Sequence, residues 1–213
     1  MTEIVQSKWK KAGWSNNGGG ARWLRTLGPE EQRGIGLGLA RVRLLKIFCC
    51  DELNKCKVGI PPGDDDLQFL PDLLVYLHWD GYPWKSFPSS FRPQYLVELN
   101  LPYSKVNKLW KGSLHLGSLK KIDLGYSENL IMLPILSKAR KLERIYLDYC
   151  SSLQEVPSYF QDLHELKTLF LEGCSSVREF PKVSKCIECL VLSRPSIEQV
   201  PSTIQDLSCI SRS

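Results

Sequence analysis

LERIYLDYCSSL (residues 142–153) is followed by LKTLFLEGCSSV (166–177), and both stretches read L-x-x-L-x-L-x-x-C-S-S when Ile145 is counted with leucine. A phrase written twice in this way has three candidate origins: a disulfide, half of a metal site, or a structural repeat. Only a structural repeat predicts further copies of the same frame at a steady period along the chain.

Four more copies of this frame are present in the chain. They are LVYLHWDGYPWKSF from Leu74, LVELNLPYSKVNKL from Leu96, LKKIDLGYSENL from Leu119 and IECLVLSRPSIEQV from Ile187. The six starts are 22, 23, 23, 24 and 21 residues apart, and VRLLKIF from Val42 fits as an earlier unit followed by an insertion. This period and pattern are typical of leucine-rich repeats.

The pattern predicts an α/β leucine-rich-repeat solenoid, which is a curved horseshoe. The first, fourth and sixth positions of each unit should point into the core, around a short parallel strand on the concave face. The second half of a unit, such as PSYFQDLHE (157–165) or PSTIQDLSC (201–209), predicts a short helix or 3-10 turn on the convex face. Its apolar residues are Phe160, Leu163, Ile204 and Leu207. One unit cannot bury its own apolar face, so about three or more must stack, and six do.

Two regions follow from this frame. Residues 1–40 contain SNNGGG (15–20) and GIGLGLA (34–40), fit no repeat, and are predicted to be poorly ordered. Residues 41–213 form a leucine-rich-repeat domain of about six to seven units, starting near residues 42, 74, 96, 119, 142, 166 and 187. We expect this domain to be incomplete at its C-terminus, because the chain stops as a further unit would begin at Ile210.

The net charge of +5 is concentrated at one end. Residues 1–48 hold nine Lys or Arg and three Asp or Glu, which leaves 19 basic and 20 acidic residues in the remainder. No apolar run approaches the ~20 residues of a membrane span, and the start lacks the apolar core of a secretory signal. We therefore expect a cytoplasmic or nucleo-cytoplasmic protein whose eight cysteines are reduced.

Three longer strings carry a family resemblance. They are LHWDGYPWKSFPSSFRPQYLVELNLPYSKVNKLWKG (77–112), HLGSLKKIDLGYSENL (115–130) and YLDYCSSLQEVPS (146–158). The chain resembles the leucine-rich-repeat region of plant intracellular disease-resistance receptors, in the class that has a Toll/interleukin-1-receptor-like domain and a nucleotide-binding switch. No P-loop is present, so the resemblance implies a truncated relative or the sensing and autoinhibitory module alone.

The resemblance implies a non-enzymatic protein-recognition module in plant innate immunity, without a cofactor or a membrane span. Its expected partners are a pathogen effector, a guarded host protein or the nucleotide-binding switch of a parent receptor, bound by a monomer. No catalytic set can be assembled around the three histidines at 78, 115 and 164, and we predict no catalytic, cofactor-binding or metal-binding residues.

Two cysteine pairs keep other interpretations open. Cys150 and Cys174 occupy the ninth position of adjacent units, close enough for a disulfide, although a reducing compartment favours buried thiols that bond neighbouring backbone. CIEC (186–189) is an alternative thiol metal or redox site. The repeat frame places Cys189 on a strand and Cys186 in the preceding turn, without the helix N-terminus that activates a redox thiol.

The N-terminal region offers two weaker alternatives. Its positive charge and its three tryptophans, Trp9, Trp14 and Trp23, could bind nucleic acid. The glycines of GIGLGLA could also indicate a dinucleotide-binding loop. The stretch lacks the third glycine and the preceding strand of such a site, which disfavours this interpretation.

The concave face is the predicted partner-binding site, because Tyr and Arg dominate binding energy at protein interfaces. The alternative is that its rings pack on one another across the strands. The predicted contact residues come from the third, fifth and eighth positions of the units. They are Tyr76, His78, Glu98, Asn100, Tyr103, Lys121, Asp123, Tyr126, Arg144, Tyr146, Tyr149, Thr168 and Phe170.

Overall fold

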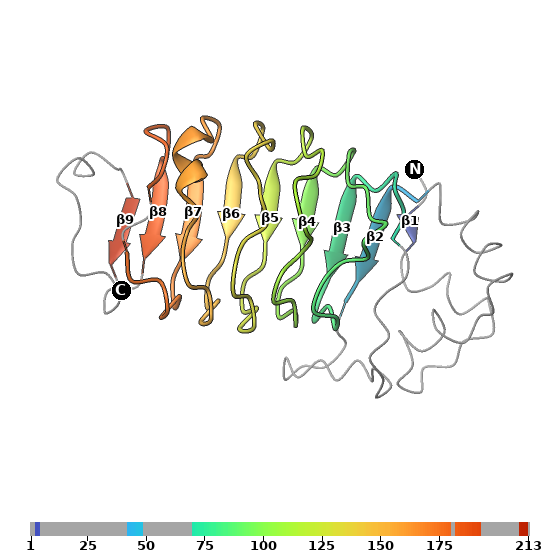
Figure 1. Cartoon of the computed structure of the whole chain (residues 1–213), viewed down its shortest axis with the longest axis horizontal. Helices are drawn as coiled ribbons and strands as arrows, with labels where there is room; N and C mark the ends of the chain where they lie inside the picture. The colour runs from blue at the N-terminus through green and yellow to red at the C-terminus, as the bar shows by residue number, and fades with distance from the viewer. Residues whose placement is uncertain (1–2, 5–41, 49–69, 180–181, 193–208, 213) are drawn as a thin grey trace, which may run out of the picture.

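The computed structural model describes residues 3–4, 42–48, 70–179, 182–192 and 209–212. Nine strands form one parallel sheet in chain order, each unit laid beside the previous one (Figure 1). The strands are β1 Glu3–Ile4, β2 Leu44–Ile47, β3 Tyr76–Trp79, β4 Glu98–Asn100, β5 Lys121–Asp123, β6 Arg144–Tyr146, β7 Thr168–Leu171, β8 Cys189–Leu192 and β9 Cys209–Arg212. The predicted leucine-rich-repeat solenoid is confirmed.

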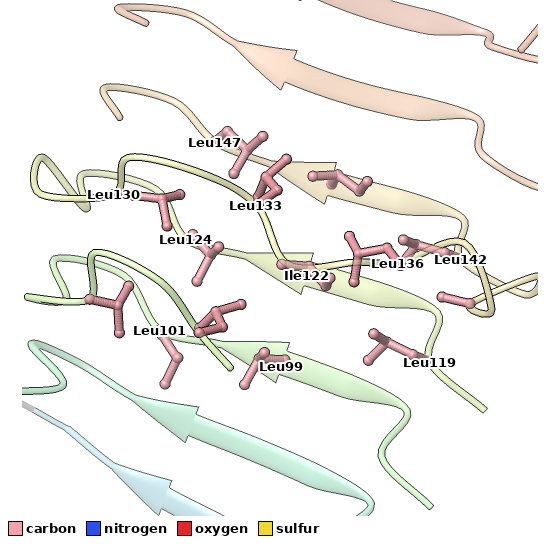
Figure 2. Packing of buried hydrophobic residues seen from close by; sticks show 14 of the residues in the cluster. Leu99, Leu101, Leu119, Ile122, Leu124, Leu130, Leu133, Leu136, Leu142 and Leu147 are labelled. Atoms are coloured by element: carbon pink, nitrogen blue, oxygen red, sulfur yellow. The ribbon is translucent and has the colours of Figure 1, made fainter. Parts of the chain in front are cut away.

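The strand register reproduces the repeat frame. The fourth positions of the units are paired in line from β3 to β8, in the order Leu77, Leu99, Ile122, Ile145, Leu169 and Leu190. These side chains and the first-position leucines are buried, and Figure 2 shows Leu99, Leu119 and Ile122 pointing into the space between the strands and the returning chain. Burying one leucine side chain contributes about 2 kcal/mol, so stacked units stabilise one another.

The returning half of each unit closes the core from the other side. Leu130, Leu133 and Leu136 pack there against the strand residues (Figure 2). Within the described ranges the only helical element is the 3-10 helix η2, Ser158–Asp162, which buries Phe160. Units of 21 to 24 residues leave little room for an α-helix, so turns replace it, in agreement with the predicted short helices or 3-10 turns. No helix in the described part is long and apolar enough to cross a membrane.

The ninth position supplies a buried hydrogen-bond donor in the three units that begin at Leu119, Leu142 and Leu166. Cys150 Sγ donates to the Leu124 carbonyl at 3.2 Å, and Cys174 Sγ donates to the Leu147 carbonyl at 3.0 Å. Ser127 Oγ makes the same bond to Leu101 at 3.2 Å. Each side chain therefore adds a bond to a carbonyl of the preceding unit, and the Leu124 and Leu147 carbonyls also accept the backbone amides of Ser127 and Cys150.

Both thiols are free rather than joined in a disulfide, which confirms that they are buried donors. Burial raises the pKa of Cys174 to about 12, and it raises the pKa of Cys150 still further above its ordinary value. The thiols consequently stay protonated at neutral pH, the form that can donate a hydrogen bond.

The ends of the sheet differ from the sequence frame in two details. β1 pairs in parallel with β2, although no strand is predicted before Val42. β9 pairs Ile210 with Leu190, so Ile210 stands at the fourth position of its unit and not at the first. The last unit therefore begins near Leu207, which shortens the preceding unit to about 20 residues. The other predictions for residues 5–41, and the apolar positions Ile204 and Leu207, lie outside the described residues.

Candidate functional site

Two columns of side chains cross the open face of the sheet in register. The third-position column runs through Tyr76, Glu98, Lys121, Arg144 and Thr168. The fifth-position column runs through His78, Asn100, Asp123, Tyr146 and Phe170. The ten strand residues predicted from the sequence thus lie side by side on five neighbouring strands.

These ten residues are unequally accessible. Arg144 is exposed and most of the others are half-buried, whereas Asn100 is only 3% exposed. The side chain of Asn100 is therefore covered by its neighbours, and a partner would meet the residues around it. Burial and the nearby carboxylate of Glu98 raise the pKa of Tyr76, which keeps its hydroxyl protonated.

In the N-terminal part of the open face, polar and charged side chains lie close to one another and to aromatic rings. His78 Nε2 lies 2.8 Å from Asp80 Oδ1, and the His78 ring packs against Phe48 with centroids 4.8 Å apart. Lys46 Nζ lies 5.2 Å from the ring centroid of Tyr76, a cation–π distance. Polar groups at this end already contact one another.

The C-terminal part of the open face combines cations with aromatic rings. Lys121 Nζ lies 3.6 Å from Asp123 Oδ2 and 5.2 Å from the ring centroid of Tyr146. Tyr146 and Phe170 meet edge to face, with centroids 5.2 Å apart and an interplanar angle of 80°. Edge-to-face contact leaves part of each half-buried ring available to solvent.

The eighth positions form a tyrosine ladder, which we define as Tyr103, Tyr126 and Tyr149. All three residues have left-handed backbone, with φ of 58°, 61° and 59°, in the turn that follows a strand. The flanking units place Gly81 and Gly173 at the same position, with φ of 63° and 70°. Glycine is the residue that this backbone conformation favours. The tyrosines of three successive units therefore have strained backbone.

The rings of the tyrosine ladder stack in sequence. Tyr103 and Tyr126 lie 4.7 Å apart between centroids at 17°, and Tyr126 and Tyr149 lie 4.7 Å apart at 11°. The three side chains are 37%, 43% and 41% exposed. The tyrosine rings therefore do pack on one another between units, which was the alternative to partner binding. The ladder nevertheless presents aromatic surface to solvent.

The ladder ends against acidic residues. Tyr149 Oη donates to Glu172 Oε1 at 3.4 Å, and the negative charge of Glu172 raises the pKa of Tyr149. Asp148 Oδ1 accepts a bond from the Glu172 amide at 3.3 Å. Desolvation raises the pKa of Asp148, and the nearby Glu172 carboxylate adds to the shift.

A row of alternating charges follows the second position, and sequence reasoning missed it. Lys120 Nζ lies 2.8 Å from Glu143 Oε1, and Lys167 Nζ lies 3.1 Å from Glu188 Oε1. The repeating Lys-Glu-Lys-Glu order at one frame position was a signal that could have predicted these pairs. Exposed ion pairs contribute little to stability, so the row mainly fixes the charge pattern beside the open face.

The CIEC motif lies where the frame placed it. Cys189 is on β8 and half-buried, while Cys186 is exposed in the turn before the strand. Among the described residues, no group of three or more His, Cys, Asp or Glu side chains is arranged to hold a metal ion. The basic N-terminal stretch and GIGLGLA lie outside the described residues.

The geometry defines the class of protein, which is a leucine-rich-repeat solenoid with an aromatic and charged open face. The Leucine Rich Repeat family model matches residues 95–113, a stretch that contains β4. The predicted resemblance to the leucine-rich-repeat region of plant disease-resistance proteins is confirmed over about half of the chain by the relatives that follow.

Three relatives from Arabidopsis thaliana illustrate the match. Disease resistance protein RPP2A is 46% identical over 115 residues, which are 54% of this chain and 9% of RPP2A. Disease resistance protein RRS1 is 42% identical over 120 residues, 56% of this chain and 9% of RRS1. Disease resistance protein RPP4 is 49% identical over 109 residues, 51% of this chain and 9% of RPP4. The match thus spans about a tenth of the length of these relatives.

Proposed function

We propose that this chain is the protein-recognition part of a plant defence protein and has no enzymatic role of its own. The observation that carries the proposal is the pair of in-register columns on the open face, together with the exposed tyrosine ladder beside them. Tyr and Arg are enriched among the residues that dominate binding energy at protein interfaces, and this face presents five tyrosines and Arg144. The similarity to proteins named for disease resistance supports a role in defence.

The proposed role is sensing or autoinhibition in the cytoplasm. The open face would bind a pathogen effector or a guarded host protein, or it would hold the nucleotide-binding switch of a parent receptor. These partners are proposed from the similarity, because the repeat scaffold sets the shape of a surface and not the identity of its ligand. Recognition would use the predicted strand residues around the covered Asn100, and the tyrosine ladder at their edge.

The experiment compares the wild-type chain with a variant carrying Arg144→Ala, Tyr146→Ala, Tyr149→Ala and Phe170→Ala. Both are expressed in plant leaf cells, crosslinked, and analysed by quantitative mass spectrometry of the recovered proteins. We expect partners recovered with the wild type to be lost with the variant, because each good anchor contributes ~2 kcal/mol or more.

A matched control changes exposed residues of the same types away from the columns, Arg140→Ala and Tyr95→Ala. This control should recover the same partners as the wild type. Equal recovery by the four-residue variant, with an unchanged circular dichroism spectrum, would show that the open face is not the recognition surface.

A further inference from the structure

One part of the open face carries a guanidinium that forms no ion pair with a described residue and that lies next to apolar rings. We call it the β6–β7 patch, and it consists of Arg144, Tyr146, Thr168 and Phe170. β6 and β7 pair in register, so Arg144 is level with Thr168 and Tyr146 is level with Phe170. The four side chains therefore form a compact square on two adjacent strands.

Arg144 has a cation as its other neighbour. Lys121 is level with Arg144 on β5. Like charges directly opposite each other on adjacent strands destabilise a sheet. Lys121 is itself paired with Asp123 Oδ2 at 3.6 Å, and the acidic residue Glu98 is level with it on β4.

Arg144 has no such ion pair within the part of the chain that the structure describes, and its electrostatic attraction to Glu143 is shared with Lys120 and Lys167. Glu143, the acidic residue next to it in sequence, is bound by Lys120 Nζ at 2.8 Å. Arg144 is exposed and forms no ion pair with a described residue. A planar guanidinium in this state is suited to binding a carboxylate through two parallel hydrogen bonds.

The apolar half of the patch lies directly beside this guanidinium. Tyr146 and Phe170 are half-buried, meet edge to face at 5.2 Å, and continue on β8 as the half-buried Val191. Rings partly desolvated by their neighbours, next to an arginine, have the composition of an interface hot spot.

We propose that the β6–β7 patch binds a protein segment that presents a carboxylate beside a bulky apolar side chain. The carboxylate pairs with Arg144, and the apolar side chain covers Tyr146 and Phe170. This inference rests on the proposed function, because it assigns a partner chemistry to the same open face. It also specifies orientation, since the acidic group lies toward the third-position column and the apolar group toward the fifth.

The test selects a random linear peptide library, displayed on phage, against the full chain. We expect selected peptides to carry Asp or Glu within two positions of Phe, Leu, Ile, Trp or Met. A selected peptide should bind at least about tenfold more weakly to Arg144→Glu, the loss that follows from replacing an ion pair with like charges. The same peptide with Lys in place of its acidic residue should regain affinity for Arg144→Glu.

Two matched variants locate the effect. Arg140→Glu makes the same charge change at an exposed arginine off the open face and should leave peptide affinity unchanged. Tyr146→Ala with Phe170→Ala should weaken binding to the same degree as Arg144→Glu. Thermal unfolding of each variant checks that the solenoid is intact.

Three results would overturn the inference: selected peptides without acidic residues, affinity that Arg144→Glu leaves intact, or an equal loss with Arg140→Glu. The proposal that the open face is a recognition surface is tested separately. It fails if the variant with four alanine substitutions recovers the same partners as the wild type. If that variant loses its partners while the library selects no acidic peptides, only the partner chemistry is wrong.

Discussion

Gly173 lies directly against the ring of Tyr149. A Cβ at position 173 would stand 2.5 Å from Tyr149 Cδ1, closer than real Cβ contacts, and Gly173 has a φ of 70°. Two separate features favour glycine at position 173, where the tyrosine ladder ends. One is its left-handed backbone, and the other is the aromatic ring resting on it.

We expect Gly173→Ala to lower the free energy of unfolding by about 2 kcal/mol or more, because alanine is strained at this φ and collides with the ring. Urea denaturation measures the change. Gly112→Ala separates the two causes, since Gly112 has a φ of 74° but nothing within 4 Å of a Cβ. Gly112→Ala should lower the free energy of unfolding only by the strain of placing alanine on left-handed backbone. Equal losses in the two variants would mean that the contact with Tyr149 adds nothing.

The middle of the ladder allows the backbone strain to be measured by itself. Tyr126→Ala and Tyr126→Gly both remove the ring and its stacking contacts with Tyr103 and Tyr149. Only the alanine variant keeps a side chain at a φ of 61°. We expect the glycine variant to be more stable than the alanine variant by about 1 kcal/mol in urea denaturation. The reverse order would show that position 126 is not strained.

The buried and exposed thiols should differ sharply in reactivity. We expect iodoacetamide at pH 8 to modify Cys186 while Cys150 and Cys174 stay unmodified, because burial raises the pKa of both buried thiols far above 8. Peptide mapping by mass spectrometry identifies the modified residues. Unfolding in urea should make Cys150 and Cys174 react as well. Rapid labelling of Cys150 in the folded protein would contradict its position in the core.

Asp148 should make stability depend on pH in the direction opposite to an ordinary ion-paired carboxylate. Its pKa is raised, first by desolvation, so it favours folding when protonated, and that contribution is lost as pH rises through the folded pKa. We expect Asp148→Asn to be more stable than the wild type at pH 7, with the difference shrinking as pH falls toward the ordinary Asp pKa.

Glu143→Gln is the control of opposite sign. The hydrogen bond from Lys120 lowers the pKa of Glu143, so its contribution is present at neutral pH and is lost as pH falls through the folded pKa. This variant should be less stable than the wild type at pH 7. Thermal unfolding across pH 3 to 8 measures both. If both variants were more stable than the wild type at pH 7, the cause would be a general effect of removing negative charge.

Much of the fold is contained in the leucine spacing. Because identical positions of successive units must pack on one another, the starts at Leu74, Leu96, Leu119 and Leu142 predict the strand register that is observed. The last unit is the exception, since a shortened repeat shifts Ile210 to the fourth position. The frame could also place the candidate contact residues on one face, because strand side chains alternate with period two.

The leucine spacing is enough to predict the solenoid, its buried positions and the columns of its open face, since these follow from a periodic pattern acting through burial. The contacts between side chains of different units are visible only in the folded structure. It buries Asn100, stacks the tyrosines on left-handed backbone, and places Arg144 beside Lys121 with no ion pair to a described carboxylate. The physical reason is that such contacts join residues 22 to 24 positions apart, and their geometry depends on the turns and register between units.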